Sequence, residues 1–223
     1  MSLSIVTNED NMEMMARYSD NFFDLAIVDP PYGIGEHGGK KREGGQSKQK
    51  GLKSKNYENK GWDNETPEKR YFDELFRVSK NQIIWGGNYF IDNLSPTPCF
   101  LVWDKKGTDG SDFADCELAW TSFKTSVRKF KYDWIGFGYI NNPQGERKIH
   151  PTQKPVQLYK WVLQNYAQPG DKILDTHLGS QSSRIAAHDM GFDFYGCELD
   201  KDYFEQGCAR YQQHIRQLNL FPA

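Results

Sequence analysis

The chain has 223 residues, of which 37% are hydrophobic and 26% charged, and its formal net charge is −2. This length suits one soluble domain. No apolar run approaches membrane-spanning length and no signal-peptide pattern opens the chain, so we expect neither a membrane anchor nor export. The four cysteines (Cys99, Cys116, Cys197 and Cys208) lack CxxC spacing, and His177 and His188 lack ligand spacing. We therefore expect no metal site and a reduced, cytoplasmic location.

The segment from residue 25 to residue 32 carries the strongest local signal. Leu25-Ala26-Ile27-Val28 reads as a buried parallel strand, and Asp29-Pro30-Pro31-Tyr32 follows it. Proline lacks an N–H, so the two prolines hold backbone carbonyls outward at the carboxyl end of the strand, where open α/β sheets place their chemistry. Two fixed acceptors and a stacking surface would suit the exocyclic amino group of a nucleobase. The competing interpretation is a strand-ending turn with a surface tyrosine.

A basic segment follows directly. Residues 33–60 contain eight basic and three acidic side chains and few apolar ones. Such a segment cannot bury itself, so we predict a mobile loop without a ligand. Its position beside the tetrapeptide favours neutralisation of nucleic-acid phosphates over a solvated insertion without a partner. The predicted DNA-binding side chains are Lys40, Lys41, Arg42, Lys48, Lys50, Lys53 and Lys55.

The middle of the chain predicts one helix and several strands. Thr66-Pro67 supplies a helix N-cap and an N1 proline, after which Phe72, Leu75, Phe76 and Ser79 share one face. Residues 82–85 and 100–103 read as buried strands. The turn between them contains Asn88 and Tyr89, which would border the base pocket. Residues 104–149 contain two predicted antiparallel strands, around 117–123 and 127–134, in a small target-recognition insert. Basic and aromatic residues alternate over 128–134. Either direct DNA contact or an ordinary half-buried strand would show this pattern.

Three helices are predicted in the last third of the chain. The first spans Pro155 to Tyr166, and Pro169-Gly170 ends it; the second spans Ser182 to Met190, before Gly191. The last helix carries an apolar stripe formed by Phe204, Cys208, Tyr211, Ile215 and Leu218. Such a stripe usually packs on the core, and an exposed one would serve a homodimer.

Several motifs resemble, in order, those of the amino-methylating DNA methyltransferases. Asp29-Pro30-Pro31-Tyr32 resembles motif IV, His150-Pro151-Thr152-Gln153-Lys154-Pro155 resembles motif X, and the stretch from Lys172 to Ser180 resembles motif I. Glu198 and Asp10 stand in the acidic positions of motifs II and III. The order IV, X, I, II is the permuted order of the β class. The resemblance covers nearly the whole chain, and four ordered motifs are far more specific than one.

This resemblance implies a Rossmann-like S-adenosylmethionine-dependent methyltransferase fold, with a mixed, mostly parallel sheet and helices on both faces, in one domain over residues 1–223. The strands that bear Asp29 and Asp175 would be neighbours, so their loops would share one cleft. The implied cofactor-binding residues are Asp10, His150, Thr152, Lys154, Asp175, Gly179, Ser180 and Glu198. Lys154 would sit near the cofactor carboxylate, Glu198 at the ribose and Asp10 at its adenine.

The implied activity is methyl transfer to the N6 amino group of a flipped adenine in DNA, with Asp29, Pro30, Pro31 and Tyr32 as catalytic residues. Asp29 in the first position favours adenine, because cytosine-N4 enzymes more often have serine there. One departure stands out in motif I, where Gln181 replaces a small residue that is commonly glycine. If this position requires a positive φ, glutamine would strain the loop and could enter the cofactor pocket. The alternatives are therefore cytosine-N4 methylation and a degenerate DNA-binding module.

Overall fold

The computed structural model describes residues 2–35, 60–105, 114–132, 134, 146 and 148–220. Its strands are β1 (Ser4–Thr7), β2 (Phe23–Val28), β3 (Ser79–Trp85), β4 (Phe100–Asp104), β5 (Cys116–Thr121), β6 (Arg128–Lys131), β7 (Lys172–Asp175) and β8 (Asp193–Cys197). Its α-helices are α1 (Asn11–Met15), α2 (Lys69–Val78), α3 (Val156–Tyr166), α4 (Ser182–Asp189) and α5 (Lys201–Leu220). Two short 3-10 helices, η1 (Gly87–Tyr89) and η2 (Ile91–Asn93), follow β3.

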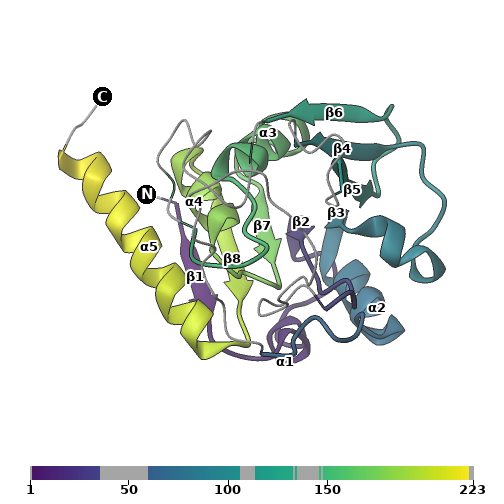
Figure 1. The fold of residues 1–223 in the computed structure, drawn as a ribbon, viewed down its shortest axis with the longest axis horizontal. Helices are drawn as coiled ribbons and strands as arrows, with labels where there is room; N and C mark the ends of the chain where they lie inside the picture. The colour runs from purple at the N-terminus through teal and green to yellow at the C-terminus, as the bar shows by residue number, and fades with distance from the viewer. Residues whose placement is uncertain are drawn as a thin grey trace, which may run out of the picture.

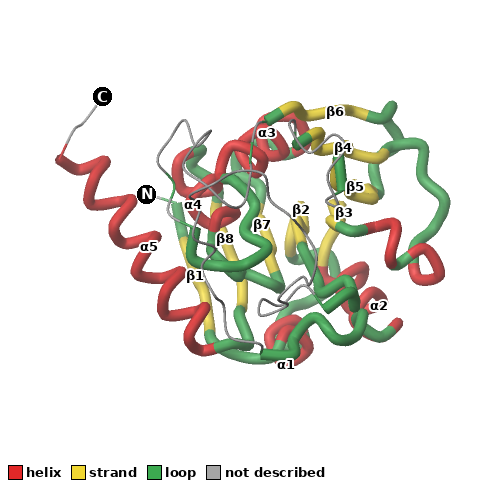
Figure 2. Tube along the Cα trace, in the orientation of Figure 1, coloured by secondary structure: helices red, strands yellow, loops and turns green. Residues whose placement is uncertain are grey.

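The described strands form one sheet in the order β1-β8-β7-β2-β3-β5-β4-β6 (Figures 1 and 2). The first five strands of this order run parallel, and β5 is antiparallel to both β3 and β4. At the far edge, β6 pairs with β4 in parallel. The structure thus confirms the predicted α/β fold with a mixed, mostly parallel sheet.

Strand neighbours that are distant in sequence bring the predicted motifs together. Leu25 pairs with Ile173 and Ala26 with Leu174, so β2 and β7 are adjacent and parallel, as predicted. Parallel strands end at the same edge of a sheet, and Asp29 and Asp175 therefore lie at neighbouring carboxyl ends. On the other side of β7, β8 and then β1 end at the same edge and deliver Glu198 and Asp10.

Alternation along β2 directs its side chains into two cores. Leu25 and Ile27 pack among residues of α3, α4 and α5. Ala26 and Val28 face the opposite way and pack among residues of α1 and α2. In Figure 1, α5 runs along β1 at one end of the sheet, while α1 and α2 lie together at the bottom of the view. Helices therefore cover both faces, and β2 is buried on both.

The predicted helix start at Thr66-Pro67 is wrong, because α2 begins at Lys69, after an extended Glu68 with φ −68° and ψ 159°. The chain just before this point is tied down. The Asp63 carboxylate accepts hydrogen bonds from the backbone N–H groups of Tyr32 and Gly33, at 2.7 and 3.0 Å. These hydrogen bonds hold the chain around Asp63 against the tetrapeptide loop, so α2 begins only after this segment.

The two strands predicted within 104–149 are present as β5 and β6, but they do not pair with each other, because β4 lies between them. They extend the central sheet instead of forming a separate hairpin. The target-recognition role of 104–149 stays a prediction. Most of the predicted basic loop, from residue 36 to residue 59, lies outside the described residues.

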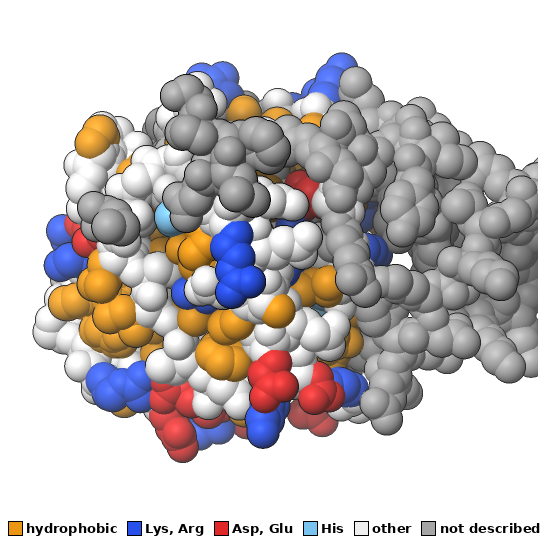
Figure 3. Space-filling view, turned by 90° about the vertical axis from the view of Figure 1, so that its left-hand side faces the viewer, with side chains coloured by type: hydrophobic (Ala, Val, Ile, Leu, Met, Phe, Trp, Pro, Cys, Tyr) orange, Lys and Arg blue, Asp and Glu red, His pale blue; other side chains and the backbone are white. Residues whose placement is uncertain are grey.

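The face that carries α5 shows apolar side chains interspersed with charged ones (Figure 3). Of the predicted stripe on α5, Tyr211 is buried and Phe204, Cys208 and Ile215 are half-buried, so these four side chains pack at least partly inward. At the neighbouring edge strand, Leu3 and Ile5 are 46% and 40% exposed. A homodimer stays a prediction. Among the described helices, none combines the length and apolar character needed to cross a bilayer.

Candidate active site

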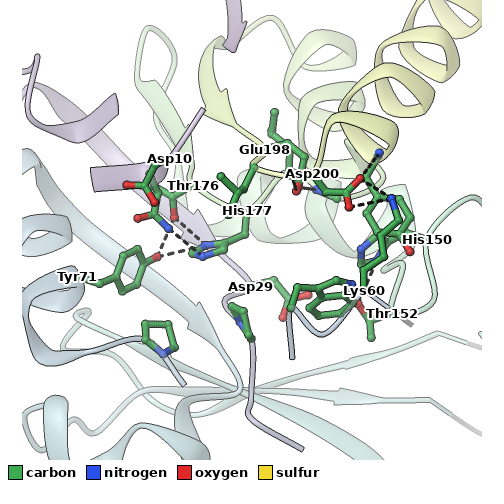
Figure 4. Close-up of a pocket in the computed structure, with 18 of the residues that line it drawn as sticks. Asp10, Asp29, Lys60, Tyr71, His150, Thr152, Thr176, His177, Glu198 and Asp200 are labelled. Carbon is green, nitrogen blue, oxygen red and sulfur yellow. Dashed lines mark hydrogen bonds and ion pairs between the residues drawn. The ribbon is translucent and has the colours of Figure 1, made fainter. Parts of the chain in front are cut away.

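A cavity of about 980 Å³ lies where β1, β8, β7 and β2 end (Figure 4). Its wall includes these residues predicted from the sequence: Asp10, Asp29, Pro31, His150, Thr152, Lys154, Gly179, Ser180 and Glu198. Pro30 and Asp175 are buried and are not among the residues that line this cavity. Figure 4 shows that Asp29 projects from one side, Asp10 and His177 lie on another, and His150 and Lys60 lie opposite them. The structure thus gathers most of the predicted catalytic and cofactor-binding residues around one space.

Asp29 directly follows β2, and both of its carboxylate oxygens accept hydrogen bonds. Its Oδ1 accepts a hydrogen bond from the Tyr32 hydroxyl at 2.6 Å, and its Oδ2 accepts one from Lys154 Nζ at 2.5 Å. Burial raises the pKa of Asp29, and the Lys154 ammonium opposes this rise. The carboxylate is thus a fixed acceptor that lies beside a positive charge.

Tyr32 is locked in position by three neighbours. Its backbone N–H donates to Asp63, and its ring stacks on Tyr89 with centroids 4.9 Å apart and planes 13° apart. The third neighbour is Gly86, which adopts φ +71°, and a Cβ atom placed there would lie 2.1 Å from Tyr32 Cε1. The glycine is required both by the left-handed backbone and by the ring that passes over it. Tyr89 thus lies beside Tyr32, and its predicted place at the base pocket stays a prediction.

Lys154 was predicted to face the cofactor carboxylate, but its ammonium lies between two carboxylates of the protein. Nζ is 2.5 Å from Asp29 and 3.0 Å from Glu117, and the side chain is only 3% exposed. Burial would raise the pKa of Glu117, but Lys154 and Lys105 together lower it to about 2. Glu117 was missed from the sequence, because only the insertion of β5 between β3 and β4 brings it here.

The loop after β7 is built by hydrogen bonds to buried groups. Asp175 accepts from the Ser183 hydroxyl at 2.5 Å and from the His177 backbone N–H at 3.0 Å, and burial raises its pKa to about 7. Gly179 has φ +46° and donates its N–H to the Glu198 carboxylate at 2.7 Å. Asp175 therefore shapes the loop from behind, while Gly179 and Glu198 face the cavity.

Gln181 does adopt the positive φ that the sequence comparison raised, at 58°. Its side chain, however, turns away from the cavity and packs against α5. The Nε2 atom donates to the Phe204 carbonyl at 3.2 Å, and Oε1 accepts from Arg184 at 2.9 Å. The space for it comes from Gly207, where a Cβ atom would lie 2.7 Å from Gln181 Cγ. The Gln181 side chain therefore does not obstruct the pocket, whereas the positive φ that was expected to strain the loop is present.

The wall near α1 is polar, and Asp10 was predicted for the site, whereas Asn11, Thr176 and His177 were not. The His177 Nε2 atom lies 3.2 Å from Asn11 Nδ2, and its Nδ1 lies 3.0 Å from the Thr176 hydroxyl. Burial lowers the pKa of His177 to about 4, so the ring is neutral at pH 7. Asn11 Nδ2 can only donate, so Nε2 accepts and Nδ1 carries the proton. Asp10 lies on this side and caps α1 by accepting from the Met12 N–H at 2.8 Å.

The opposite wall is aromatic. The His150 ring lies between Trp62 and Tyr203, with centroid distances of 5.2 and 4.3 Å, and burial lowers its pKa to about 3. Thr152 contacts His150 Nδ1 through its hydroxyl at 3.2 Å. Lys60 binds Asp200 at 2.8 Å and so fixes the end of the segment that carries Trp62 to the start of α5.

The structure tests neither the predicted DNA-binding residues nor the expectation that the chain holds no metal. Lys40, Lys41, Arg42, Lys48, Lys50, Lys53 and Lys55 lie outside the described residues. Over the described ranges, no cluster of three or more histidine, cysteine or acidic side chains is arranged to hold a metal ion.

Comparison with known proteins places residues 102–208 in the DNA methylase family of the N6/N4 type. The DNA adenine methyltransferase YhdJ of Escherichia coli K12 is 37% identical over 65 residues, which are 29% of this chain and 22% of that protein. The type II methyltransferase M.BglII of Bacillus subtilis is 29% identical over 73 residues, which are 33% of this chain and 20% of that protein. Both alignments thus cover a minor part of the relative's length.

Solved structures agree over nearly the whole chain. The M1.HpyAVI–SAM complex superimposes with a TM-score of 0.55 and 18% identity, covering 94% of this chain and 100% of that one. The cytosine-N4-specific PvuII DNA methyltransferase gives a TM-score of 0.61 and 11% identity, covering 98% of this chain and 92% of that one. At these identities the likeness shows the fold.

The matched region contains the motif X and motif I segments and Glu198, whereas Asp29 lies outside it. Strand pairing nevertheless brings Asp29 to the same cavity as Gly179 and Glu198. Motif order and sheet topology therefore lead to one conclusion. Together with the match over residues 102–208, they support an N6/N4 DNA methyltransferase family for this chain.

Proposed function

We propose that this protein transfers a methyl group from S-adenosylmethionine to the N6 amino group of adenine in DNA. The observation that carries the proposal is the pairing of β2 with β7, which places the Asp29 acceptor and the Gly179–Glu198 pair in one cavity. An amino group held at Asp29 and a methyl donor held at Glu198 would then meet without a covalent enzyme intermediate.

The cavity fits the cofactor in size and chemistry. Its volume of about 980 Å³ lies at the upper end of the range for small-molecule sites, which leaves room for part of a base as well. Glu198 provides a carboxylate for ribose hydroxyls, and Leu199, 71% exposed beside it, provides an apolar platform for the cofactor's adenine ring. Asp10 provides an acceptor on the same side. When bound, S-adenosylmethionine supplies the electrophilic methyl group on its sulfonium.

The protein's part is to raise the reactivity of the target nitrogen. The lone pair of an exocyclic amino group is delocalised into the ring, so the nitrogen is a poor nucleophile. Asp29 and the Pro30 carbonyl accept its two N–H groups and localise the lone pair. Methylation of this nitrogen would develop positive charge on it next to Asp29, and one of its protons would then pass to the Asp29 carboxylate. Fixed acceptors aimed at developing charge are the strongest general source of such acceleration.

The base must leave the duplex to reach this cavity. Tyr89, which is 45% exposed, covers one ring face of Tyr32. The flipped base displaces Tyr89 and stacks on Tyr32 instead. The basic segment beside the tetrapeptide neutralises phosphates of the same strand. Adenine is favoured because Asp29 leads the tetrapeptide, and the similarity to a protein named as an adenine methyltransferase supports this choice. The function is proposed for the chain in the cytoplasm, with DNA as its partner.

Product analysis tests the proposal. DNA is incubated with the protein and cofactor labelled in the methyl group, and the DNA is then digested to nucleosides. Label in N6-methyladenine is the expected result. Label only in N4-methylcytosine would overturn the base assignment and keep the chemistry. No label in DNA of diverse sequence, with cofactor binding confirmed by calorimetry, would overturn the proposed transfer.

A further inference from the structure

Lys154 and Glu117 form a buried charge arrangement beside the proposed acceptor. Lys154 Nζ contacts Asp29 Oδ2 at 2.5 Å, the Tyr32 hydroxyl at 3.2 Å and Glu117 Oε2 at 3.0 Å. Lys105 binds the other oxygen of Glu117 at 2.5 Å. Charges therefore alternate from Asp29 through Lys154 and Glu117 to Lys105, which is 20% exposed at the outer end.

Such an arrangement needs a reason, because burying charges costs free energy that their attraction only partly recovers. The Lys154 side chain is only 3% exposed, so water solvates its ammonium poorly. It also lies 5.6 Å from the ring centres of Tyr32 and Trp85, which leaves it little freedom to turn elsewhere. Its two carboxylate partners come from the end of β2 and from β5, so the contact exists only in the assembled sheet. A simple packing role would be met by an uncharged side chain of the same length.

We propose that Lys154 and Glu117 are a positioning pair for Asp29: the Lys154 ammonium keeps the Asp29 carboxylate ionised and aimed, and Glu117 holds that ammonium from the other side. The inference rests on the proposed methyl transfer, in which Asp29 must accept hydrogen bonds from the amino group. Neither residue touches the reacting atoms in this account. Both act through Asp29, in contrast to the cofactor contact predicted for Lys154 from the sequence.

The pair has opposite effects on Asp29. Burial raises the pKa of this carboxyl group, Lys154 lowers it, and Glu117 raises it. The ionisable groups that face Asp29 from the packed elements are Tyr32 in its own loop, Tyr71 of α2, Glu117 of β5, Lys154 before α3, Tyr159 of α3 and Asp175 of β7. Lys154 is the cation of this set, so its loss leaves burial and the neighbouring acids to favour the protonated form.

Two substitutions should consequently move the titration of Asp29 in opposite directions. Lys154→Gln keeps a hydrogen-bonding side chain but removes the charge, and the Asp29 midpoint should rise by about one to three pH units. Glu117→Gln leaves Lys154 to Asp29 alone, and the midpoint should fall. Lys154→Arg keeps the charge, so its Asp29 midpoint should stay near the wild-type value. Lys160→Gln is the matched control, because Lys160 on α3 pairs with Asp189 at 2.6 Å, away from the cavity.

The midpoint is measured directly in protein labelled with ¹³C at aspartate carboxyl carbons. The Asp29 signal is assigned by its loss in Asp29→Asn, and circular dichroism confirms that each variant is folded. Single-turnover methylation is measured over the same pH range. The pH at which the rate reaches half of its maximum should be higher in Lys154→Gln than in wild type. A protonated Asp29 carboxyl group has fewer acceptor positions, so it cannot accept from the amino group as well as from its protein neighbours.

Opposite shifts in the two variants, with no shift in Lys160→Gln, would support the pair. Folded Lys154→Gln protein with an unchanged Asp29 midpoint would overturn it, as would shifts of the same sign in both variants. These outcomes do not depend on turnover. If the variants shift in opposite directions but the wild-type protein methylates no DNA, the proposed function is refuted and the positioning pair is supported. If the wild-type protein methylates DNA but the variants show no shifts, the positioning pair is refuted and the proposed function is supported.

Discussion

Replacing Gly86 by alanine should disturb the tetrapeptide, although Gly86 lies outside it. The new Cβ atom would lie 2.1 Å from Tyr32 Cε1, a separation that real structures do not tolerate. Gly191→Ala is the matched control, because Gly191 also has a positive φ (+78°) but meets nothing within 4 Å. The difference between the two variants therefore isolates the collision from the backbone strain.

The structure sets the size of this difference. Both variants lose about 1–2 kcal/mol to the left-handed backbone. Gly86→Ala must in addition displace the Tyr32 ring, which forfeits the stack on Tyr89 and the hydroxyl bond to Asp29. An aromatic pair contributes about 0.5–1.5 kcal/mol and a hydrogen bond to a charged group about 1.5–3 kcal/mol. Gly86→Ala should thus cost about 2–4.5 kcal/mol more than the control.

Urea unfolding followed by circular dichroism gives the free energies, and single-turnover methylation gives the functional effect. Methyl transfer should fall at least about tenfold in Gly86→Ala and stay near wild type in Gly191→Ala, while cofactor affinity changes in neither. Equal unfolding free energies and equal methylation in the two variants would refute the reasoning that Gly86 makes room for Tyr32.

Three further variants probe the cofactor side of the cavity. Glu198→Ala removes the acceptor of the Gly179 N–H and of the proposed ribose contact, so calorimetry should show cofactor affinity lowered by about tenfold to more than a hundredfold; unchanged affinity would contradict the ribose assignment. Asp175 has a folded pKa of about 7, above its ordinary 3.8, so folding binds protons in this window and the unfolding free energy of wild type relative to Asp175→Asn should fall as pH rises from about 4 to 7. If urea titrations show that the difference in unfolding free energy between wild type and Asp175→Asn does not vary with pH, the raised pKa of Asp175 is contradicted. Gln181→Ala should lower the unfolding free energy by about 1–3 kcal/mol through its lost bonds to α5 and leave cofactor affinity unchanged, and weaker cofactor binding at equal stability would show that Gln181 does reach the pocket.

The local sequence predicts the parts of the site that lie at strand ends. Asp29 and Asp175 follow short apolar strands, and the family order of motifs implies that these strands are neighbours, which the pairing of β2 with β7 confirms. Glu117 could not be predicted in the same way, because its approach to Lys154 depends on β5 lying between β3 and β4, two strands that precede it in the chain. Topology of this kind leaves no local periodic signal.

Side-chain direction is the second thing that the sequence leaves open. The positive φ at Gln181 follows from the motif, but the direction of its side chain depends on Gly207, a remote residue on α5 that leaves space for it. The same holds for Lys154, whose motif implies a cofactor contact while its ammonium binds Asp29. Both outcomes were decided by tertiary neighbours and not by the motif itself.

The most direct test of the account is to separate cofactor binding from methyl transfer at Asp29. Asp29→Ala and the control Asp20→Ala, whose side chain is 73% exposed, are compared with wild type in calorimetry and in single-turnover methylation of the same DNA. We predict that Asp29→Ala binds S-adenosylmethionine with nearly wild-type affinity and transfers no methyl group, while Asp20→Ala matches wild type in both. Near wild-type methylation by Asp29→Ala would contradict the central claim that this carboxylate accepts the target amino group.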